Sequence, residues 1–538
     1  MTNLETLITT NLDTWSSAIK AKAMAGQGDG KKQDFYGIRK LRRLIRDLAV
    51  EGHLVTQDAA DEPASKFLEE SAEIKAKLTK EGKIKKQEDL PPIPAEDIPF
   101  PLPKGWSWEK LGNLVEMYNG RAFKPSEWAN EGLPIVRIQN LNDEFAPFNY
   151  YVGDLSENHR ISDGTFLISW SGTPGTSFGA FIWKRGEAAL NQHINKCKFH
   201  HPGTNLEFMQ LVVTGQMDHF ISKAQGGVGL KHVTKGTLNN AILAIPPKSE
   251  QRHIVAKVGE LMALCDQLEK KEEESLRTHQ TLVNTLLEDL TAADESGEVD
   301  EAWKRIATSF ETLFTTESSI DELKKTILQL AVRGKLIPFS ADRVPQTVGD
   351  HVDFQNGYAF KSEWFKASGI RLCRNVNVSH GILDWSESVF VDENVAQEFQ
   401  RFALSEGDIV LSLDRPLITT GLKVARVQKA DLPCLLLQRV AKPVPKHCEL
   451  DLSYFHLWLN SPDFTDSIDP GRSNGVPHIS TRQVQKLPFV LPPLPEQRLI
   501  VTKVDELMGL CERLKTSLSN ANSTQLTLAD RLVEAAII

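Results

Sequence analysis

Two segments of this 538-residue sequence carry similar polar side chains at similar spacing. The first reads "NGRAFKPSEW" (residues 119–128) and the second reads "NGYAFKSEW" (residues 356–364). Arg137 and Arg374 follow them at matched distances. Arginine, lysine, asparagine and glutamine side chains offer fixed positive charge or hydrogen-bonding groups to a partner. The chemistry that these segments favour is therefore recognition through hydrogen bonds and charge.

The sequence contains no arrangement of residues that is typical of catalysis. The stretch "GQGDGKKQ" lacks the spacing of a phosphate-binding loop, and no His-Glu-x-x-His zinc motif occurs. The Asn/Asp-Pro-Pro-aromatic tetrapeptide of amino-methyltransferases is also absent from the sequence, and "QGGVGLKH" lacks the strand–helix context of a dinucleotide site. We therefore expect a chain that is not an enzyme and that holds no cofactor or metal.

The elements that must position the polar segments are themselves repeated. The stretch "PPKSEQRHIVAKVGELMALCDQLEK" (246–270) aligns without a gap with "PPLPEQRLIVTKVDELMGLCERLK" (492–515). A second motif, Leu-Ala-Val-x-Gly-x-Leu, occupies residues 48–54 and again residues 330–336. Self-similarity over a long, fixed interval indicates an internal duplication.

Apolar residues in the two Pro-Pro stretches follow a 4-3-4-3 spacing, which places them along one face of a helix. These residues are Ile254, Val258, Leu261, Cys265 and Leu268 in the first copy, and Ile500, Val504, Leu507, Cys511 and Leu514 in the second. Leu282 and Leu286 recur as Leu528 and Leu532, so each helix is expected to run about 40 residues, or roughly 60 Å. We call this apolar face of each helix the seam, and we interpret its two cysteines, Cys265 and Cys511, as small core residues.

The order of the repeated motifs predicts an α+β fold. Both domains are expected to be mixed α/β, because glycine, proline and aromatic residues interrupt short apolar strands in each. Long antiparallel, coiled-coil helices are expected to separate the two domains in a pseudo-two-fold internal repeat. The predicted parts are an N-terminal helical scaffold (1–55), a charged helix and proline-rich linker (56–104), a first domain (105–247), central helices (248–344), a second domain (345–493) and a C-terminal helix (494–538).

Composition narrows the class of protein. The net charge of −9 is not typical of a protein that binds nucleic acid by itself. Residues 105–245 contain equal numbers of basic and acidic side chains, so the affinity of the chain alone for phosphates should be modest. No run of eighteen apolar residues is present, which predicts no membrane span. The start lacks an export signal and the six cysteines are scattered, so we expect a cytoplasmic protein.

Taken together, the repeated motifs resemble the specificity subunit of Type I restriction–modification enzymes. The residues that carry this resemblance are the two "PPxxEQxxIVxKVxELMxLC" stretches, the two "LAVxGxL" stretches, and "PxGWxWxxLG" at 103–112, with "DEPASxxL" and "EGKIKK" between them. The resemblance implies two target recognition domains, each binding one half of a split double-stranded DNA site, with the helices as a ruler. It also implies two docked modification subunits, with restriction subunits added to those. The cofactors S-adenosylmethionine, ATP and Mg would reside on these partners, which methylate adenine.

With that resemblance, the polar side chains of matched loops become candidate DNA contacts. Arginine and lysine suit guanine edges, and asparagine and glutamine suit adenine edges. In the first domain the candidates are Arg121, Lys124, Arg137, Gln139, Asn140, Lys231 and His232. In the second domain they are Lys361, Arg371, Arg374, Asn375, Asn377 and His478. Residues shared by the domains are expected to hold the fold or touch the DNA backbone, and unshared residues to read bases.

Simpler interpretations stand beside each of these. The charged candidates also suit ordinary surface salt bridges, and Lys231, His232 and His478 also suit a turn or helix cap. For the whole chain, one alternative is a structural coiled-coil adaptor without DNA readout, and another is an enzyme with unrecognised motifs. An adaptor would be indifferent to DNA sequence in the presence of the modification subunit, whereas an enzyme would methylate or cut DNA alone.

Overall fold

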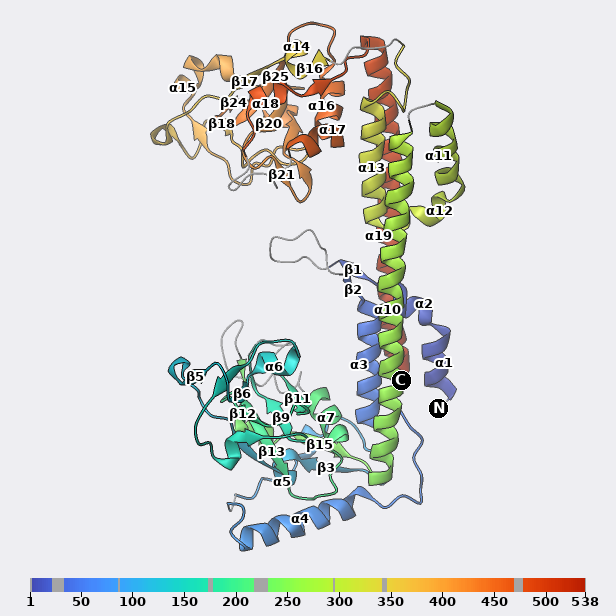
Figure 1. The fold of residues 1–538 in the computed structure, drawn as a ribbon, viewed down its shortest axis with the longest axis vertical. Helices are drawn as coiled ribbons and strands as arrows, with labels where there is room; N and C mark the ends of the chain where they lie inside the picture. Colours follow the sequence, from blue (N-terminus) through green and yellow to red (C-terminus); the bar gives the residue numbers. More distant parts are fainter. Residues whose placement is uncertain are drawn as a thin grey trace. The chain divides into compact units, whose positions relative to one another are not determined.

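The computed structural model describes residues 2–21, 33–85, 88–172, 178–216, 231–293, 296–340, 346–468 and 478–537. The chain divides into two compact units. Unit 1 comprises Met1–Glu273 with Asn522–Ile538, and unit 2 comprises Glu274–Ala521. Each unit contains one β-rich domain and one group of helices (Figure 1). Two long helices, α10 (Lys248–Ala292) and α19 (Leu494–Ile537), contribute residues to both units.

The long helices confirm the predicted length, with 45 residues in α10 and 44 in α19. The repeated glutamine of the Glu-Gln-Arg motif explains how each helix begins. The buried Gln251 side chain donates to the Pro246 carbonyl at 3.0 Å, and the buried Gln497 donates to the Pro492 carbonyl at 2.7 Å. Since carbonyls ahead of a helix have no partner within it, this bond joins the preceding proline pair to the first turn.

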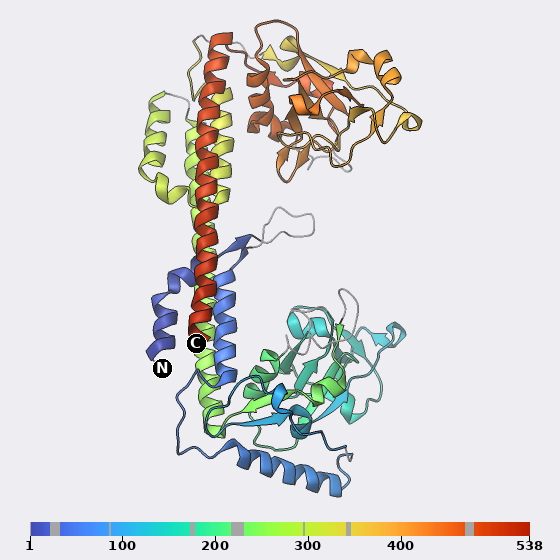
Figure 2. The same ribbon diagram turned by 180° about the vertical axis from the view of Figure 1, so that it is seen from behind.

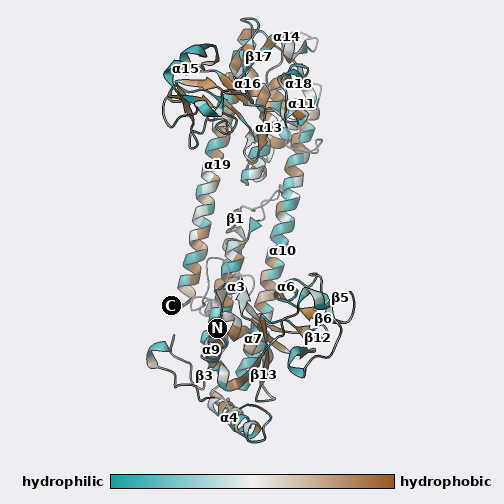
Figure 3. Cartoon of the chain, turned by 90° about the vertical axis from the view of Figure 1, so that its left-hand side faces the viewer, coloured by the Kyte–Doolittle hydropathy of each residue, from teal (hydrophilic) through white to brown (hydrophobic). Residues whose placement is uncertain are grey.

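The predicted seam is buried along both helices. Ile254, Leu261 and Cys265 are buried in α10, as are Ile500, Val504 and Cys511 in α19. Val258, Leu268, Leu507 and Leu514 are half-buried. Hydrophilic and hydrophobic residues alternate along these helices (Figure 3).

The heptad rhythm does not persist along the whole of α10. Leu282, which continues it, is 50% exposed, whereas the neighbouring Val283 is only 1% exposed. A straight helix has 3.6 residues per turn, so a buried stripe drifts away from a strict seven-residue repeat within a few heptads.

In unit 1, helix α3 (Tyr36–Glu51) is held to the long helices by polar contacts. Arg42 pairs with Asp266 and Glu269 of α10, each at 2.5 Å. The Tyr36 hydroxyl donates to Asp530 of α19 at 2.8 Å. Helices α1 (Thr2–Thr10) and α2 (Leu12–Ser17) lie on the side of this bundle opposite the β-rich domain (Figures 1 and 2).

In unit 2, α13 (Glu317–Val332) occupies the corresponding place, and its buried residues share one hydrophobic core with those of α11 (Ser296–Thr308) and α12 (Phe310–Leu313). Lys324 of α13 pairs with Glu512 of α19 at 2.6 Å. Lys324 and Glu512 occupy the positions that Arg42 and Asp266 occupy in the first copy, so the duplication keeps this ion pair although both residues have changed. Such exposed pairs contribute little stability, and this one marks the register of the two helices.

The repeated Leu-Ala-Val-x-Gly-x-Leu motif ends both short helices as predicted. Gly52 closes α3 with φ at 80°, and Gly334 follows the C-cap of α13 with φ at 71°. Only glycine adopts this left-handed conformation without a steric penalty.

The first β-rich domain contains two main sheets. The antiparallel sheet has the order β11-β9-β13-β4, built from Gly179–Ile182, Phe166–Ser169, Ile194–Phe199 and Val115–Asn119. The second sheet has the order β5-β7-β6-β12-β8, built from Trp128–Ala129, Asn149–Tyr151, Leu133–Val136, Ala188–Leu190 and Arg160–Ile161. Strands β6 and β12 are parallel, so the second sheet is mixed.

The second β-rich domain repeats the antiparallel order in full and has a shorter mixed sheet. Its antiparallel sheet is β23-β20-β25-β17, built from Val424–Arg426, Ile409–Ser412, Val440–Pro445 and Val352–Asn356. Its mixed sheet is β19-β18-β24, built from Phe390–Val391, Ile370–Cys373 and Cys434–Leu436, and β18 and β24 are parallel. The two α+β domains and the internal repeat are therefore as the sequence predicts.

The Asn-Gly pair at the start of each polar segment marks a crossing between the two sheets. A Cβ atom on Gly120 would lie 2.1 Å from the Asn191 carbonyl oxygen, and one on Gly357 would lie 2.1 Å from the Leu437 carbonyl oxygen. The next residue in each segment forms a parallel bridge to that same strand region. Glycine is required here because no side chain fits between the two backbones.

Residues 56–104, which lack a counterpart in the second half, form α4 (Ala64–Lys80) and a short 3-10 turn (Ala95–Asp97). The adjoining strand β3 (Ser107–Lys110) pairs with β15 (Ile242–Ile245), which leads through two prolines into α10. Strands β16 (Gln346–Thr347) and β26 (Pro488–Phe489) form the equivalent pair ahead of α19. In each repeat the first and last strands of the β-rich domain thus meet beside a long helix.

A buried carboxylate connects the first domain to the start of α10. The indole nitrogen of Trp106 donates to Oε2 of Glu250 at 2.9 Å, and within the described part of the chain Oε1 of this residue is buried without a partner. Burial raises the pKa of the Glu250 carboxyl, and the Trp106 bond only partly offsets this. A raised pKa means that the folded state binds this proton more tightly than the unfolded state, so the Glu250 contribution to stability falls as pH rises through that range.

Replacing Glu250 by glutamine should therefore stabilise the protein at pH 8. The amide oxygen still accepts from Trp106, while the buried charge is removed. Thermal unfolding of the full chain should give E250Q a higher Tm than the wild type at pH 8, with the difference shrinking toward pH 4.5. E273Q, on the exposed face of the same helix, is the control. A lower Tm for E250Q at pH 8 would contradict this account.

Candidate nucleic-acid interface

The predicted cations of the first domain meet at one corner of its mixed sheet. The Arg121 guanidinium lies over the rings of Phe123 (5.0 Å) and Tyr151 (4.9 Å) and forms an ion pair with Glu127. The Arg137 guanidinium lies 5.7 Å from the centre of the Trp128 ring. Because Trp128 pairs with Tyr151 between strands β5 and β7, the two arginines belong to the same corner.

Lys124 and Gln139 complete this corner with exposed side chains. The Lys124 backbone nitrogen donates to Glu127 at 2.8 Å, so the segment that presents the lysine is held in place while its ammonium group extends outward. Gln139 lies on the short helix α6 (Ile138–Asn142), which follows strand β6. The structure thus brings Arg121, Lys124, Arg137 and Gln139 into one neighbourhood.

Asn140 has a different role from the one that the sequence suggested. It is fully buried, and its Oδ1 accepts from the Arg137 backbone nitrogen at 3.0 Å. Its Nδ2 donates to the carbonyls of Ala146 (3.0 Å) and Pro147 (3.3 Å). Since donor and acceptor are both used internally, the structure argues against a base contact and makes Asn140 the residue that pins the loop of residues 137–148, called loop 1 below.

The second domain pins its own loop, residues 374–388 (loop 2), in the same way. The buried Asn377 accepts from the Arg374 nitrogen at 3.2 Å and donates to the carbonyls of Asp384 (2.9 Å) and Glu387 (3.0 Å). The internal bonds of Asn377 argue against its predicted base contact in the same way. The Arg-x-x-Asn spacing in both loops is the sequence signal for this arrangement.

The cations of the second domain are less tightly grouped. Arg374 donates to the Glu387 carbonyl, so it braces loop 2. Arg371 donates to the carbonyls of Ala430 (2.9 Å) and Leu432 (3.3 Å) and lies 4.9 Å from the centre of the Trp385 ring. Lys361 is exposed, 5.5 Å from the centre of the Trp364 ring. Arg371 therefore serves the packing of loop 2, and Lys361 is the more accessible cation.

Two further candidates meet on Asp414. The Asn375 side chain donates to Asp414 at 3.3 Å, and Nδ1 of His478 lies 2.9 Å from the same carboxylate. The next residue, Arg415, is exposed and adopts φ of 46°, which is uncommon for a residue other than glycine. Strained residues cluster at functional sites, so Arg415 joins the candidates. Sequence reasoning missed it because the matching position in the first domain is Gly172.

Backbone pairing shows that His232 and His478 occupy equivalent positions in the two domains. Lys231 and His232 form strand β14, in which His232 pairs with Ser171, and His478 bridges Asp414 at the matching place in the second domain. The side chains of Lys231 and His232 lie outside the described residues. Their candidacy stays a prediction.

Arg185 is a second residue that the sequence did not single out. It donates to the carbonyls of Asn140 and, at 3.3 Å, Glu144, and its guanidinium lies 4.5 Å from the centre of the Trp183 ring. Arg185 therefore supports loop 1 from outside and adds a cation beside it. Arg185 lies in the first domain but outside the motifs that recur in the second domain, so motif spacing did not single it out.

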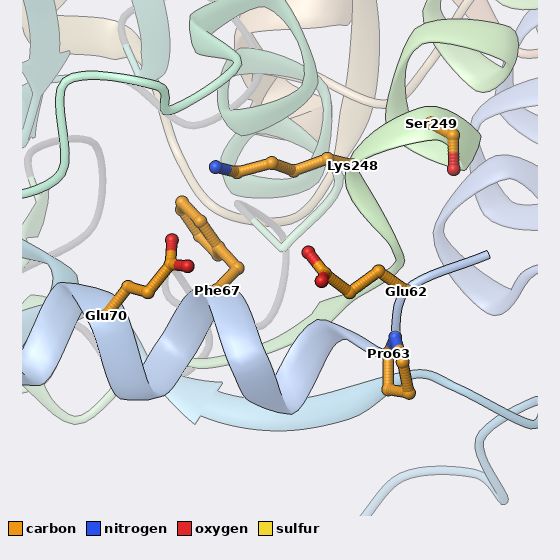
Figure 4. Close-up of a pocket in the computed structure, with 6 residues that line it drawn as sticks. All are labelled: Glu62, Pro63, Phe67, Glu70, Lys248 and Ser249. Atoms are coloured by element: carbon orange, nitrogen blue, oxygen red, sulfur yellow. The ribbon is translucent and has the colours of Figure 1, made fainter.

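Unit 1 contains a small hollow between α4 and the start of α10 (Figure 4). It has a volume of about 210 Å³ and is lined by Glu62, Pro63, Phe67, Glu70, Lys248 and Ser249. The Lys248 ammonium group lies 4.8 Å from the centre of the Phe67 ring. Pockets that hold small ligands usually enclose about 300–1,000 Å³. This hollow is a seam between two helices and offers little room for a cofactor.

Within the described ranges, no group of three or more histidine, cysteine or acidic residues is arranged to hold a metal ion. A search of the same ranges found no helix whose length and apolar character would suit a membrane crossing.

Comparisons with known proteins agree with this arrangement. A family model described as "Type I restriction modification DNA specificity domain" matches residues 103–278. The specificity subunits of the Type I restriction enzymes EcoAI and EcoEI, both from Escherichia coli, are 39% and 29% identical to this chain, and each comparison covers 99% of this chain and 100% of the relative. A solved structure from work on complex assembly and conformational transition of the type I R-M system has a TM-score of 0.51 at 16% identity, covers 81% of this chain and 99% of its own, and shares the fold.

Two β-rich domains that share an antiparallel sheet order, each carrying an arginine-flanked loop pinned by asparagine, define a two-domain protein built by duplication. The chain belongs to the specificity subunits of Type I restriction–modification systems, which recognise the DNA target site. It is the non-catalytic subunit of such a system and carries no cofactor itself.

Truncating Asn140 should loosen loop 1. N140A leaves the buried Arg137 nitrogen and two carbonyls without their side-chain partner, which costs about 1–3 kcal/mol. The expected result is a lower Tm and faster amide exchange across residues 137–148. Q139A, on the exposed face of the same short helix, should change neither, and N377A should affect only residues 374–388. Equal exchange rates in N140A and Q139A would contradict the pinning role.

Proposed function

We propose that each β-rich domain reads one half of a bipartite, asymmetric DNA site. One observation carries this proposal. The two domains share a sheet order and an asparagine-pinned loop, but the exposed residues on those loops differ. A common scaffold that presents different side chains suits two readers of two different sequences.

The candidate residues form two groups, those that we propose to contact DNA and those that brace a loop. Arg121, Lys124, Arg137 and Gln139 in the first domain form one cationic corner. Lys361, Asn375, Arg415 and His478 are their functional counterparts in the second domain, where Arg371 and Arg374 brace the loop. Aromatic rings beneath several of these cations hold them in place, which reduces the entropy lost on binding.

The balanced charge of the first domain implies help from other subunits. Phosphate neutralisation supplies much of the affinity of DNA-binding proteins, and this chain has few spare positive charges. We propose two modification subunits that clasp the duplex and methylate adenine with S-adenosylmethionine, and restriction subunits that use ATP and Mg. We also place the complex in the cytoplasm, because its ligand is DNA.

Exchanging one domain should change one half of the recognised sequence. We would replace residues 345–493 with the corresponding domain of a related specificity subunit and sequence the methylated sites produced by the assembled complex. The half-site read by residues 105–247 and the length of the gap should both stay unchanged. A structural adaptor would give no sequence change at all. A change in both halves would show that the domains do not read independently.

Lengthening both long helices should lengthen the gap between the half-sites. Each helix contributes residues to both units, and the boundary between the units falls after Glu273 in α10 and after Ala521 in α19. We would insert four helix-forming residues at each of these two points. Four residues add about 6 Å, and DNA rises about 3.4 Å per base pair, so the gap should grow by one to two base pairs. The same residues added after Ile538 are the control. Sequencing methylated sites decides the outcome, and an unchanged gap with full activity would exclude the ruler.

A further inference from the structure

Each pinned loop carries an exposed apolar side chain at the same position. Phe145 of loop 1 is 86% exposed, and Ile382 of loop 2 is 63% exposed. Each stands two residues before a carbonyl that the pinning asparagine binds, which is Pro147 in loop 1 and Asp384 in loop 2. Single exposed apolar side chains are common on protein surfaces, so the observation that points to a contact here is their recurrence at the matched position of both copies.

The loops hold these side chains outward by specific bonds. In loop 1, the Phe145 nitrogen donates to Asp143 at 2.9 Å, and Arg185 donates to the neighbouring Glu144 carbonyl at 3.3 Å. In loop 2, the Ser379 nitrogen donates to the Ile382 carbonyl at 3.0 Å, and the Gly381 nitrogen donates to Val424 at 2.8 Å. A tip that is fixed in this way loses little conformational freedom when it binds.

The surroundings of the loop 1 tip favour the base edges of DNA as the partner, and loop 2 shares its matched position. Arg137 and Arg374 are the first residues of loops 1 and 2 and bind carbonyls within their own loops, and Arg185 binds loop 1 from outside. Cations therefore stand at the base of both loops. Asp143 and Glu144 directly precede Phe145, and their carboxylates would be repelled by phosphates. An apolar residue beside carboxylates is instead suited to the major groove, where thymine offers a C5-methyl group and cytosine an amino donor.

We propose that Phe145 and Ile382 are specificity-determining residues, each of which contacts the C5-methyl group of a thymine in its own half-site. This inference rests on the proposed division of the site between the two domains. The neighbouring exposed position differs between the loops as well, with Gln139 in loop 1 and the 51% exposed Val376 in loop 2. The apolar residue is therefore the feature common to both loops, and the position beside it distinguishes them.

The test uses the specificity subunit assembled with its modification subunits. Once methylome sequencing gives the target, single thymines of a duplex are replaced by uracil, which lacks only the C5-methyl group. Wild-type binding should weaken roughly fourfold at one position of each half-site, the effect of one lost apolar methyl contact. F145S should abolish that sensitivity in the first half-site alone, and I382S in the second alone. V152S is the matched control, because Val152 is 67% exposed but lies outside loop 1.

Four outcomes would overturn the proposal. Three of them are tolerance of uracil at every position, wild-type sensitivity kept by F145S and I382S, and a half-site with no thymine on either strand. If F145S instead weakens capture of the modification subunit while the recognised sequence is unchanged, the tip binds protein, which also overturns it. Failure of the proposed division of the site gives a different result, since both variants would then alter the same half-site.

Discussion

Burial of one apolar stripe along α10 and α19 is the constraint on which the rest of the molecule depends. In unit 2 the residues of this stripe from both long helices join α13 in a single hydrophobic core. In unit 1 the stripe residues of α10 lie beside α3, whose polar contacts reach both long helices. Because the closing strands β15 and β26 lead through proline pairs into these helices, each β-rich domain is attached to its helix without a long flexible linker. The stability of the bundle and the placement of each domain on its own helix therefore have the same physical origin.

Within each domain, a buried asparagine holds one loop in place, as burial of the stripe holds the bundle together. Asn140 and Asn377 hold loops of different sequence in the same way, using backbone groups that every sequence provides. Side-chain identity on the exposed positions can then change without disturbing the loop. This arrangement separates the framework of the loop from the chemistry of its surface.

The duplication also shows which contacts the fold requires. The Arg42–Asp266 pair of the first copy became Lys324–Glu512 in the second, so a salt bridge of the same sign was kept with other side chains. Gly120 and Gly357 did not change, because a backbone crossing leaves no room for a Cβ atom. Arg121, by contrast, became Tyr358, whose ring packs against Phe360 and Phe399. Charge and close approach are thus conserved between the copies where they position the backbone, and surface chemistry is not.

The sequence by itself determined the duplication, the long helices, their buried seam and the two mixed domains. These features follow from local periodicity and from motifs that recur, and both are visible along a single chain. It also proposed the segments that carry the candidate site, which remain a prediction. Only the tertiary structure decided which polar residues face outward. Asn140 and Asn377 read as recognition residues until their bonds to carbonyls six to ten residues away were known. Arg185 and Arg415 were invisible for the converse reason, since bonds to a distant loop and a strained backbone leave no periodic mark. Burial and hydrogen bonding depend on residues that are distant along the chain, so a linear pattern finds the segment and the fold assigns each side chain its task.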